Sequence, residues 1–347
     1  MYTIDELVKQ AKDKGSSDIH LICGLPPKYR VDGQLESMAD TPLTGEDCYE
    51  LCKSLAGDYF DDNKKIGELD FSREICENRC RCHVFWQQGK LSAAIRLLSS
   101  NIPKLSDLGL PPAVPEFTKL HKGIVLVTGE TGSGKSTTLA AILNEINHTR
   151  KDHIVTLEDP IEYIYTPDQC IINQREIGKD TVSFADGLRA SLREDPDIIM
   201  IGEMRDKDTI ETAITAAETG HLVFATLHTD CASDAVDRIV QVFPEGMQNQ
   251  IRLQLSMTLQ AVVAQQLLKR KLGGRVLACE VMVVTDAIRN MIRTGNTPQI
   301  ANAIATSSSL GGQTMDQALV SLVRSRQIDR DLAIEHGKDK EFIRKSS

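Results

Sequence analysis

A short stretch of this chain, KGIVLVTGETGSGKSTT at residues 122–138, constrains the fold more than any other part of the sequence. From Gly129 to Ser136 it has the G-x-x-x-x-G-K-[ST] spacing of a phosphate-binding loop, after an apolar run and before a helix-compatible run. Glycines let backbone N–H groups come close to phosphate oxygens, because a Cβ would block some of the required conformations. The stretch therefore predicts a strand, a loop and a helix that together bind a nucleotide.

The side chains of this loop have distinct expected roles. Lys135 would reach the β- and γ-phosphates, and the Ser136 hydroxyl would hold Mg²⁺. The helix N-terminus adds partial positive charge at the same point. The expected cofactors are therefore ATP and Mg²⁺. The residues expected to contact the nucleotide are Gly129, Glu130, Thr131, Gly132, Ser133, Gly134, Lys135, Ser136 and Thr137.

Length and composition limit the other possibilities. A chain of 347 residues is long enough for two or three domains with a sizeable core. Its formal net charge of −9 argues against a protein whose main task is to coat nucleic acid. No apolar run approaches the roughly 20 residues that cross a bilayer, and the start MYTIDELVKQAKDKG lacks a signal-peptide core. We therefore expect a cytoplasmic protein.

Nine cysteines raise the question of a disulfide framework or a metal site. An odd number in a long charged chain is not typical of a disulfide scaffold. A metal site would draw on Cys76, Cys80, Cys82 and His83, with Cys48 and Cys52 as further candidates. Because the C-x-C spacing lacks the recurring C-x-x-C pairs of zinc ribbons, reduced and partly buried thiols are favoured over a metal site.

The pattern of apolar residues divides the chain into segments. Residues 1–100 predict a small α+β domain, and the turn-rich residues 101–112 predict a linker. Residues 113–275 form the expected α/β core, in which short apolar strands alternate with helices up to about Phe243, as in a mostly parallel sheet. The chain then reads as predominantly helical, including a mainly helical region at 276–347, with one more strand pair around Arg275 to Val284. The first domain is expected to contain helices at 3–14 and 45–56, strands at 18–22, 69–72, 79–87 and 91–97, and a hairpin turn at Asp32-Gly33.

Four successive strands of the expected parallel sheet end in polar residues. The first leads into the phosphate-binding loop, and the other three lie at 153–157, 197–201 and 221–227. The carboxyl ends of parallel strands meet at one edge of a sheet, where ligands bind. The polar residues that follow the last three strands are Glu158, Asp159 and Glu162; Glu203, Arg205 and Asp206; and His228 with Thr229.

These strand ends suggest roles in phosphoryl transfer. Glu203 is placed to act through Mg²⁺ and its waters, although Gly202 stands where an aspartate is often found. Glu158 and Glu162 are candidates to polarise the attacking water, and His228 to hydrogen-bond the γ-phosphate. Taken singly, a carboxylate after a strand is more often solvated or caps a helix. Four such ends beside a phosphate-binding loop favour a catalytic site.

These segments closely resemble the secretion-ATPase superfamily, within it the GspE/PilB/PilT family, over essentially the whole chain. GETGSGKSTT is similar to its Walker A motif, VTLEDPIEY to its Asp box, LREDPDIIMIGEMRD to its atypical Walker B segment and GHLVFATLHT to its His box. SDIHLICGLPPKYRVDGQL resembles its PAS-like N-terminal module, AIRNMIR a signature associated with pilus retraction, and TMDQAL its tail. The resemblance implies an α/β fold: a RecA-like P-loop ATPase core with a small α+β PAS-like N-terminal domain and a helical C-terminal region.

The resemblance also implies an activity and an assembly. The chain would be an ATP-hydrolysing motor that powers type IV pilus retraction, and so twitching motility, by removing pilin subunits from the fibre base. It would form a ring-shaped homohexamer, peripheral to the cytoplasmic face of the inner membrane. Its expected partners are an inner-membrane pilus platform protein and other type IV pilus machinery, and no nucleic acid.

By the same resemblance, Glu162 is the expected general base and Glu203 the Mg²⁺-linked Walker B carboxylate. Arg81 and Arg96 in the N-terminal module, and Arg193 and Arg205 in the core, are the candidates to neutralise γ-phosphate charge, since a guanidinium is planar and permanently charged. An ordinary surface ion pair is the alternative explanation for each of these four arginines.

Two departures from the family pattern bear on these expectations. Residues 77–89, ENRCRCHVFWQQG, replace apolar positions of a strand with cysteines, which leaves the register of the arginines there open. The tetracysteine insertion and the long N-terminal extension of the secretion and pilus-extension relatives are absent, which favours the retraction branch.

Two other functions compete with a retraction motor. A slow-hydrolysing, nucleotide-gated accessory subunit of a pilus or secretion machine would bind ATP tightly with negligible hydrolysis. A RecA-like nucleic-acid motor would need a basic channel, often with stacking aromatic side chains, and the acidic balance and single tryptophan, Trp86, disfavour it. The 287–293 segment is expected on a helix with Ile288, Met291 and Ile292 on one face, which a helix packed on the core explains equally well.

Overall fold

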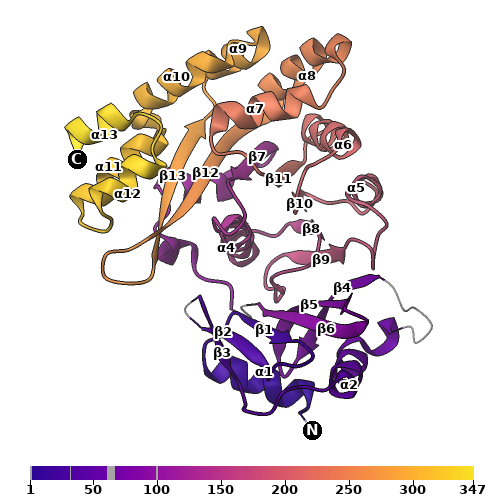
Figure 1. Ribbon diagram of the computed structural model, residues 1–347. Helices are drawn as coiled ribbons and strands as arrows, with labels where there is room; N and C mark the ends of the chain where they lie inside the picture. The colour runs from indigo at the N-terminus through magenta and orange to yellow at the C-terminus, as the bar shows by residue number, and fades with distance from the viewer. Residues whose placement is uncertain (1, 32, 61–66, 99–100) are drawn as a thin grey trace. The chain divides into compact units, whose positions relative to one another are not determined.

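The structure, a computed structural model, describes residues 2–31, 33–60, 67–98 and 101–347. It contains two compact units, and each is described by itself (Figure 1). The N-terminal unit comprises residues 1–101 and 160–164, and the core unit comprises residues 102–159 and 165–347. Asp32 of the expected Asp32-Gly33 turn lies outside the described residues, but the strands on either side of it pair with each other.

The N-terminal unit is a six-stranded antiparallel sheet packed on two helices, in the strand order β3-β2-β1-β6-β5-β4. Thr3 and Thr44 begin the two helices with capping boxes, which satisfy backbone donors in the first turn. Residues of α1, α2 and one face of the sheet form a single apolar cluster. The elements are α1 Ile4–Asp13, β1 Asp18–Leu21, β2 Lys28–Val31, β3 Gln34–Ser37, α2 Gly45–Ala56, β4 Glu68–Ile75, β5 Asn78–Gln87 and β6 Lys90–Leu97.

Cysteines fill part of the core of the N-terminal unit. Cys48 and Cys52 on α2 and Cys80 and Cys82 on β5 are all fully buried among apolar side chains. Burial raises the pKa of the Cys48 thiol to about 11 and that of the other three to about 12, so all four are neutral thiols. Across the residues described, no group of three or more His, Cys, Asp or Glu side chains is arranged to hold a metal ion.

The core unit is built on a seven-stranded sheet in the order β13-β12-β7-β11-β10-β8-β9. Its strands run parallel except β13, which pairs antiparallel with β12. The expected α/β fold class, with a mostly parallel core sheet, is confirmed. The strands are β7 Gly123–Thr128, β8 His153–Glu158, β9 Ile171–Glu176, β10 Ile198–Ile201, β11 Leu222–Leu227, β12 Leu259–Lys269 and β13 Arg275–Val283.

Helices cover the core sheet. Every residue of β7, β10 and β11 is buried, as expected for parallel strands with both faces covered. Alternate strand residues such as Ile124 and Leu126 join one apolar cluster with helices α6 to α10. The helices are α3 Ala113–Glu116, α4 Lys135–Thr149, α5 Phe184–Ser191, α6 Lys207–Glu218, α7 Ala232–Gln241, α8 Glu245–Thr258, α9 Asp286–Thr294, α10 Ile300–Thr306, α11 Met315–Arg324, α12 Arg330–His336 and α13 Lys340–Ser346.

Two strands were missed by the sequence pattern. β9 is a half-exposed edge strand with polar residues, so it lacks the apolar run by which the other parallel strands are recognised. β12 follows α8 with no residue between them and carries three buried or half-buried glutamines. The prediction of a predominantly helical chain after Phe243 is therefore wrong for residues 259–269. Because β12 pairs with β7, the core sheet continues through β13 to Val283 (Figure 1).

Candidate functional site

The phosphate-binding loop leaves the end of β7 and enters α4. Gly129, Gly132 and Gly134 have positive φ values of 140°, 84° and 92°, which L side chains rarely adopt. A Cβ on Gly129 would lie 2.4 Å from the backbone oxygen of Gln265 and 2.6 Å from Ser133 Oγ. Only glycine fits at residue 129, because the first turn of the loop lies directly against β12.

Polar groups of the loop are arranged to receive an anion. The Lys135 ammonium donates to the carbonyl oxygens of Gly129 and Glu130 at 2.7 and 2.9 Å, so the side chain folds back over the loop. Within the described chain, the buried Ser133 Oγ has no hydrogen-bond partner. Ser136 lies exposed in the first turn of α4. Lysine, hydroxyl and helix N-terminus thus converge where phosphate oxygens would bind.

Glu203 joins the ends of β10 and β11. Its Oε1 lies 2.5 Å from Arg205 Nε and 3.2 Å from His228 Nε2. The backbone N–H of Met204 donates to the Thr226 carbonyl at 3.1 Å, which fixes the turn that carries Glu203. The structure therefore brings together three of the predicted site residues, Glu203, Arg205 and His228.

The environment of Glu203 keeps it ionised. Burial is the largest influence on its pKa and by itself raises it, but the hydrogen bond from Arg205 and the charges of His228 and Arg205 together outweigh burial. The pKa of Glu203 is therefore lowered, and the carboxylate is negative at neutral pH. A negative group near the phosphate-binding loop suits contact with a cation or with an activated water.

Gly202 stands in the Walker B segment where an aspartate is common, and the structure gives a steric reason. Its N–H donates to the Leu157 carbonyl at 2.7 Å, so the end of β10 lies close against the end of β8. A Cβ at this position would come within 3.1 Å of that carbonyl oxygen and 3.4 Å of the Glu158 Cα. A larger residue would separate the two strand ends.

Glu158 is buried at the end of β8, with only 7% of its surface exposed. It accepts hydrogen bonds from Thr156 Oγ1 at 2.7 Å and from Gln174 Nε2 at 3.2 Å. The alternative of a solvated carboxylate is therefore excluded for this residue. Glu162 lies four residues further on, in the segment 160–164 that belongs to the N-terminal unit, and its assignment as general base stays a prediction.

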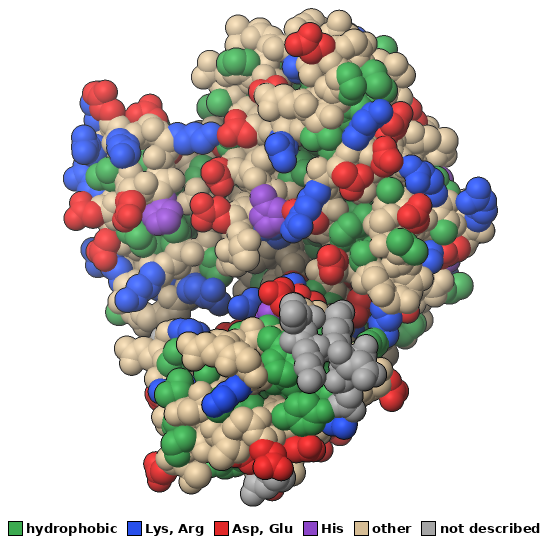
Figure 2. Space-filling view, turned by 45° about the vertical axis from the view of Figure 1, so that its right-hand side comes forward, with side chains coloured by type: hydrophobic (Ala, Val, Ile, Leu, Met, Phe, Trp, Pro, Cys, Tyr) green, Lys and Arg blue, Asp and Glu red, His purple; other side chains and the backbone are tan. Residues whose placement is uncertain are grey.

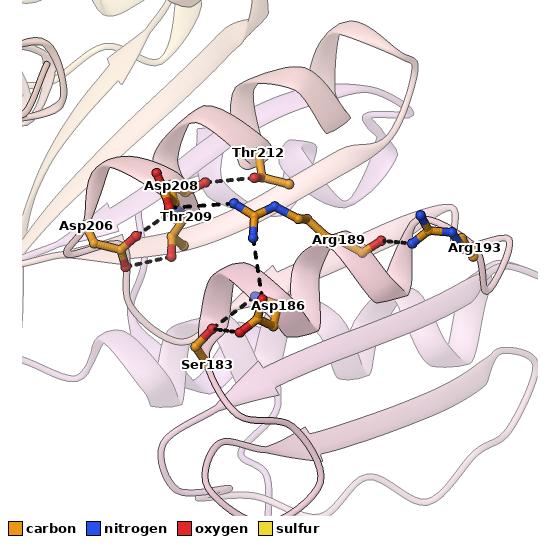
Figure 3. Close-up of polar contacts among 8 residues, drawn as sticks. All are labelled: Ser183, Asp186, Arg189, Arg193, Asp206, Asp208, Thr209 and Thr212. Atoms are coloured by element: carbon orange, nitrogen blue, oxygen red, sulfur yellow. Dashed lines mark hydrogen bonds and ion pairs between the residues drawn. The ribbon is translucent and has the colours of Figure 1, made fainter.

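The arginines of the core unit differ in their contacts. Arg205 pairs with Glu203. Arg193, in contrast, donates to the backbone carbonyl of Arg189 at 3.1 Å (Figure 3). Arg189, which the sequence reading missed, lies between Asp186 on its own helix and Asp208 on α6, at 3.4 and 3.7 Å. Its spacing from Asp186, i to i+3 on a helix, was the available signal. Arg193 is thus attached to the end of α5, and Arg205 belongs to the Glu203 group.

The arginines of the N-terminal unit share one face of its sheet. Arg81 and Arg96 are direct cross-strand partners, and Arg96 Nε lies 2.9 Å from Asp18 Oδ1. Asp18 in turn pairs across β1 and β2 with Arg30. Because Cys80 and Cys82 alternate with Arg81 and are fully buried, Arg81 lies on the opposite, exposed face. The register that the cysteine-rich strand left open is thereby settled.

The AIRNMIR segment forms most of α9. Ile288 and Ile292 are fully buried, as the predicted apolar face requires. Arg289 Nη1 donates to the carbonyl oxygens of Ser256 and Leu259 at 2.8 and 3.2 Å, so it caps the last turn of α8. The sequence did not reveal this capping role, because the acceptors lie some 30 residues away along the chain.

Comparisons with known proteins agree with this geometry. A family model described as "Type II/IV secretion system protein" matches residues 1–330. The chain is 45% identical over 337 residues to the type IV pilus retractation ATPase PilT of Pseudomonas aeruginosa, covering 96% of this chain and 98% of that protein. It is 41% identical over 348 residues to a twitching motility protein of Neisseria gonorrhoeae, covering 99% and 92%. The crystal structure of the pilus retraction motor PilT with bound ADP matches with a TM-score of 0.91 and 45% identity, covering 99% of this chain and 100% of that one.

Proposed function

The chain belongs to the type II/IV secretion system protein family, and on that premise we propose that it is the ATPase that powers retraction of type IV pili. The observation that carries this function is the placement of the Lys135 loop and the Glu203–His228–Arg205 group at the carboxyl ends of β7, β10 and β11, which are neighbours in one parallel sheet. Similarity over nearly the full length to a pilus retraction ATPase supports it. The chain is an ATP-hydrolysing enzyme, and its work is the disassembly of pilin at the base of the fibre.

The loop of residues 129–137 binds the nucleotide. Backbone N–H groups at the glycines and at the start of α4 hold phosphate oxygens. Lys135 exchanges its contacts with the Gly129 and Glu130 carbonyls for the β- and γ-phosphates. The unpartnered Ser133 hydroxyl supplies a further donor to the same anion. Glu130, Thr131 and Thr137 complete the proposed nucleotide contacts.

Hydrolysis is an in-line displacement at the γ-phosphorus. A water attacks, its proton passes to Glu162 as general base, and the bond from the γ-phosphorus to the bridging oxygen of ADP breaks. His228 hydrogen-bonds the γ-phosphate. Its Nε2 also lies 3.2 Å from Glu203 Oε1, so departure of the phosphate changes the contacts of both side chains. Glu158, fixed by Thr156 and Gln174, orders the end of β8 beside this position.

The donor set at the loop fits Mg²⁺. The Ser136 hydroxyl and the ionised Glu203 carboxylate offer the oxygen ligands that Mg²⁺ prefers. Gly202 offers no side chain, so Glu203 is the Walker B carboxylate that would hold the ion. When bound, the ion neutralises charge on the β- and γ-phosphates.

Four arginines and a ring-shaped assembly complete the proposed ATPase. Arg81 and Arg96, exposed on one face of the N-terminal sheet, neutralise γ-phosphate charge, and Arg193 and Arg205 do so from the core. The active form is a homohexameric ring at the cytoplasmic face of the inner membrane, bound to a platform protein and other pilus machinery. No helix among the described residues combines the length and apolarity needed to cross a membrane. The ring is therefore proposed to attach as a peripheral complex.

The face drawn in Figure 2 and the net charge do not favour a nucleic-acid motor. On the face drawn in Figure 2, Lys and Arg side chains are interspersed with Asp and Glu rather than gathered into a continuous basic track. Such a track is what a motor on nucleic acid needs. The formal net charge of −9 also argues against a motor that moves on nucleic acid.

Steady-state phosphate release with Glu203→Gln tests the proposal. The variant keeps the shape of the side chain but loses the negative charge, and we expect turnover to fall on the order of 100-fold while ATP binding persists. Glu218→Gln, on α6 and bonded to Gln254 at 2.9 Å, is the matched control and keeps wild-type turnover. Wild-type protein that binds ATP but releases no phosphate would instead identify an accessory subunit.

A further inference from the structure

A buried carboxylate lies outside the proposed catalytic group, on β13. Glu280 is 6% exposed, and its Oε1 accepts a hydrogen bond from the Ala232 N–H at 2.8 Å. Its other oxygen accepts from the Met315 N–H at 3.4 Å. Ala232 and Met315 are the first residues of α7 and α11, so one side chain meets the N-termini of two helices.

The two helix starts depend on Glu280 to different degrees. The N-cap of α7 is Cys231, which makes no capping hydrogen bond to that helix, so the carboxylate supplies an acceptor that the local sequence lacks. The N-cap of α11 is Thr314, which has a complete capping box with Gln317. Removing Glu280 should therefore loosen the start of α7 more than the start of α11.

The start of α7 is close along the chain to the catalytic group. β11 ends at Leu227 and α7 begins at Ala232, so residues 228–231 are the whole connection. That connection carries His228, whose Nε2 lies 3.2 Å from Glu203. One end of the connection is fixed by the sheet, and the other end is fixed at Ala232 by Glu280.

The same carboxylate connects this region to the C-terminal helices. β13 pairs with Gln313 through two backbone hydrogen bonds at Val281, of 2.7 and 3.0 Å, immediately before α11. Asp316, in the first turn of α11, accepts from the N–H groups of Lys338 and Asp339 at 2.8 and 3.0 Å. Burial by itself lowers the pKa of Lys338, but the neighbouring Cys231, Asp234 and Glu280 side chains outweigh burial, so the pKa is raised. Glu280 therefore holds the starts of α7 and α11, and Asp316 in the first turn of α11 holds the segment that begins α13.

We propose that Glu280 is a positioning residue for ATP hydrolysis: it holds the start of α7, and through it the His228 connection, in register with Glu203, and it ties that connection to the C-terminal helices. This rests on the proposed function, in which His228 contacts the γ-phosphate. Glu280 acts on the chemical step and leaves nucleotide binding at the Lys135 loop unchanged.

Turnover measured at varied ATP concentration tests the proposal in the full-length protein. We expect Glu280→Ala to lower kcat on the order of 10-fold, with KM within about 2-fold of wild type, because a displaced strand-end group disturbs the transition state more than the bound nucleotide. Glu280→Gln keeps one acceptor oxygen for Ala232 and should recover most of the lost kcat. Thr314→Ala, which removes only the cap of α11, should leave kcat unchanged.

A double-substitution cycle distinguishes positioning from general destabilisation. If Glu280 acts through His228, Glu280→Ala adds no further loss of kcat in a His228→Ala background. An unchanged kcat in Glu280→Ala, or a loss that adds fully to that of His228→Ala, overturns the proposal.

Hydrogen exchange read by mass spectrometry gives a result that does not depend on activity. Peptides covering residues 228–235 should exchange faster in Glu280→Ala and not in Thr314→Ala, because only the first removes the acceptor of the Ala232 N–H. Unchanged exchange in these peptides overturns the proposal even if the wild-type protein hydrolyses no ATP. Absence of wild-type hydrolysis is the separate failure of the proposed function.

Discussion

The two sheets of this protein present their candidate functional groups in different ways. In the core unit the central strands are buried on both faces, so the polar groups gather at the edge where β7, β10 and β11 end. In the N-terminal unit one face of the antiparallel sheet is covered by α1 and α2, and the other carries Arg30, Asp18, Arg96 and Arg81 in one cross-strand row. Chemistry at a strand end depends on backbone geometry, whereas chemistry on a sheet face depends only on which side chains point outward.

The largest effect should come from the strand end. Gly129→Ala places a Cβ 2.4 Å from the Gln265 carbonyl oxygen and should abolish nucleotide binding and turnover. Gly220→Ala is the matched control, since it also has a positive φ, of 111°, but nothing lies within 4 Å of the added Cβ. Equilibrium binding of a fluorescent ATP analogue checks both variants. Equal loss in both would mean that backbone strain alone, and not the contact with β12, is responsible.

The exposed face of the N-terminal sheet should tolerate substitution structurally but not catalytically. Arg96→Ala and Arg81→Ala should lower turnover by about 100-fold if these guanidinium groups stabilise transition-state charge. Their thermal unfolding midpoints should stay close to wild type, because exposed ion pairs contribute little. Arg30→Ala, in the same row, is the control and should keep most of the activity. Equal turnover in all three variants and the wild type would remove this face from the mechanism.

Gly202 tests how strongly the strand-end geometry is fixed. Gly202→Asp introduces the carboxylate that is common at this position, but its Cβ would lie 3.1 Å from the Leu157 carbonyl oxygen. We expect turnover to fall by about 10-fold as the ends of β8 and β10 separate. Turnover assays with Gly202→Ala and Gly202→Asp distinguish the steric effect from that of charge. Higher activity in the aspartate variant would contradict the steric account.

The covered face of the N-terminal sheet should matter for stability alone. Cys82→Ser puts a hydroxyl in a fully buried, apolar position and should cost roughly 1–3 kcal/mol. The thermal unfolding midpoint should fall while the turnover of folded protein is unchanged. A reduced kcat in fully folded Cys82→Ser protein would show that the covered face of the sheet influences the exposed face.

The smallest effect concerns the pairing of Asp18 with Arg96. Burial is the largest influence on the pKa of Asp18 and raises it, but hydrogen bonds from Ser17 and Arg96 outweigh it, and the pKa is lowered. A lowered folded-state pKa adds stability that is present above the usual aspartate value of 3.8 and is lost as the pH falls through the lower one. The free energies of unfolding of wild type and Asp18→Asn should differ slightly at pH 7, by about 1 kcal/mol or less, and converge as the pH falls through the lowered pKa of Asp18. A constant difference would contradict the assignment.

Local patterns predicted the parts of the fold that depend on neighbours in sequence. The phosphate-binding loop, the capped helices at Thr3 and Thr44 and the apolar strands β7, β10 and β11 are all visible as spacing or periodicity. β12 was missed because nothing in the pattern separates it from α8. Long-range contacts had no local signal: the cap of α8 by Arg289, the acceptor that Glu280 gives to Ala232, and the close approach of Gly202 to Leu157.

The distribution of thiols in the N-terminal unit has a practical consequence. Cys48, Cys52, Cys80 and Cys82 are buried, whereas Cys76 lies exposed at the turn between β4 and β5. A thiol-reactive dye added to the native protein should therefore attach first at Cys76, without any engineered site. Fluorescence from that position would report on the surroundings of the turn between β4 and β5 during nucleotide turnover.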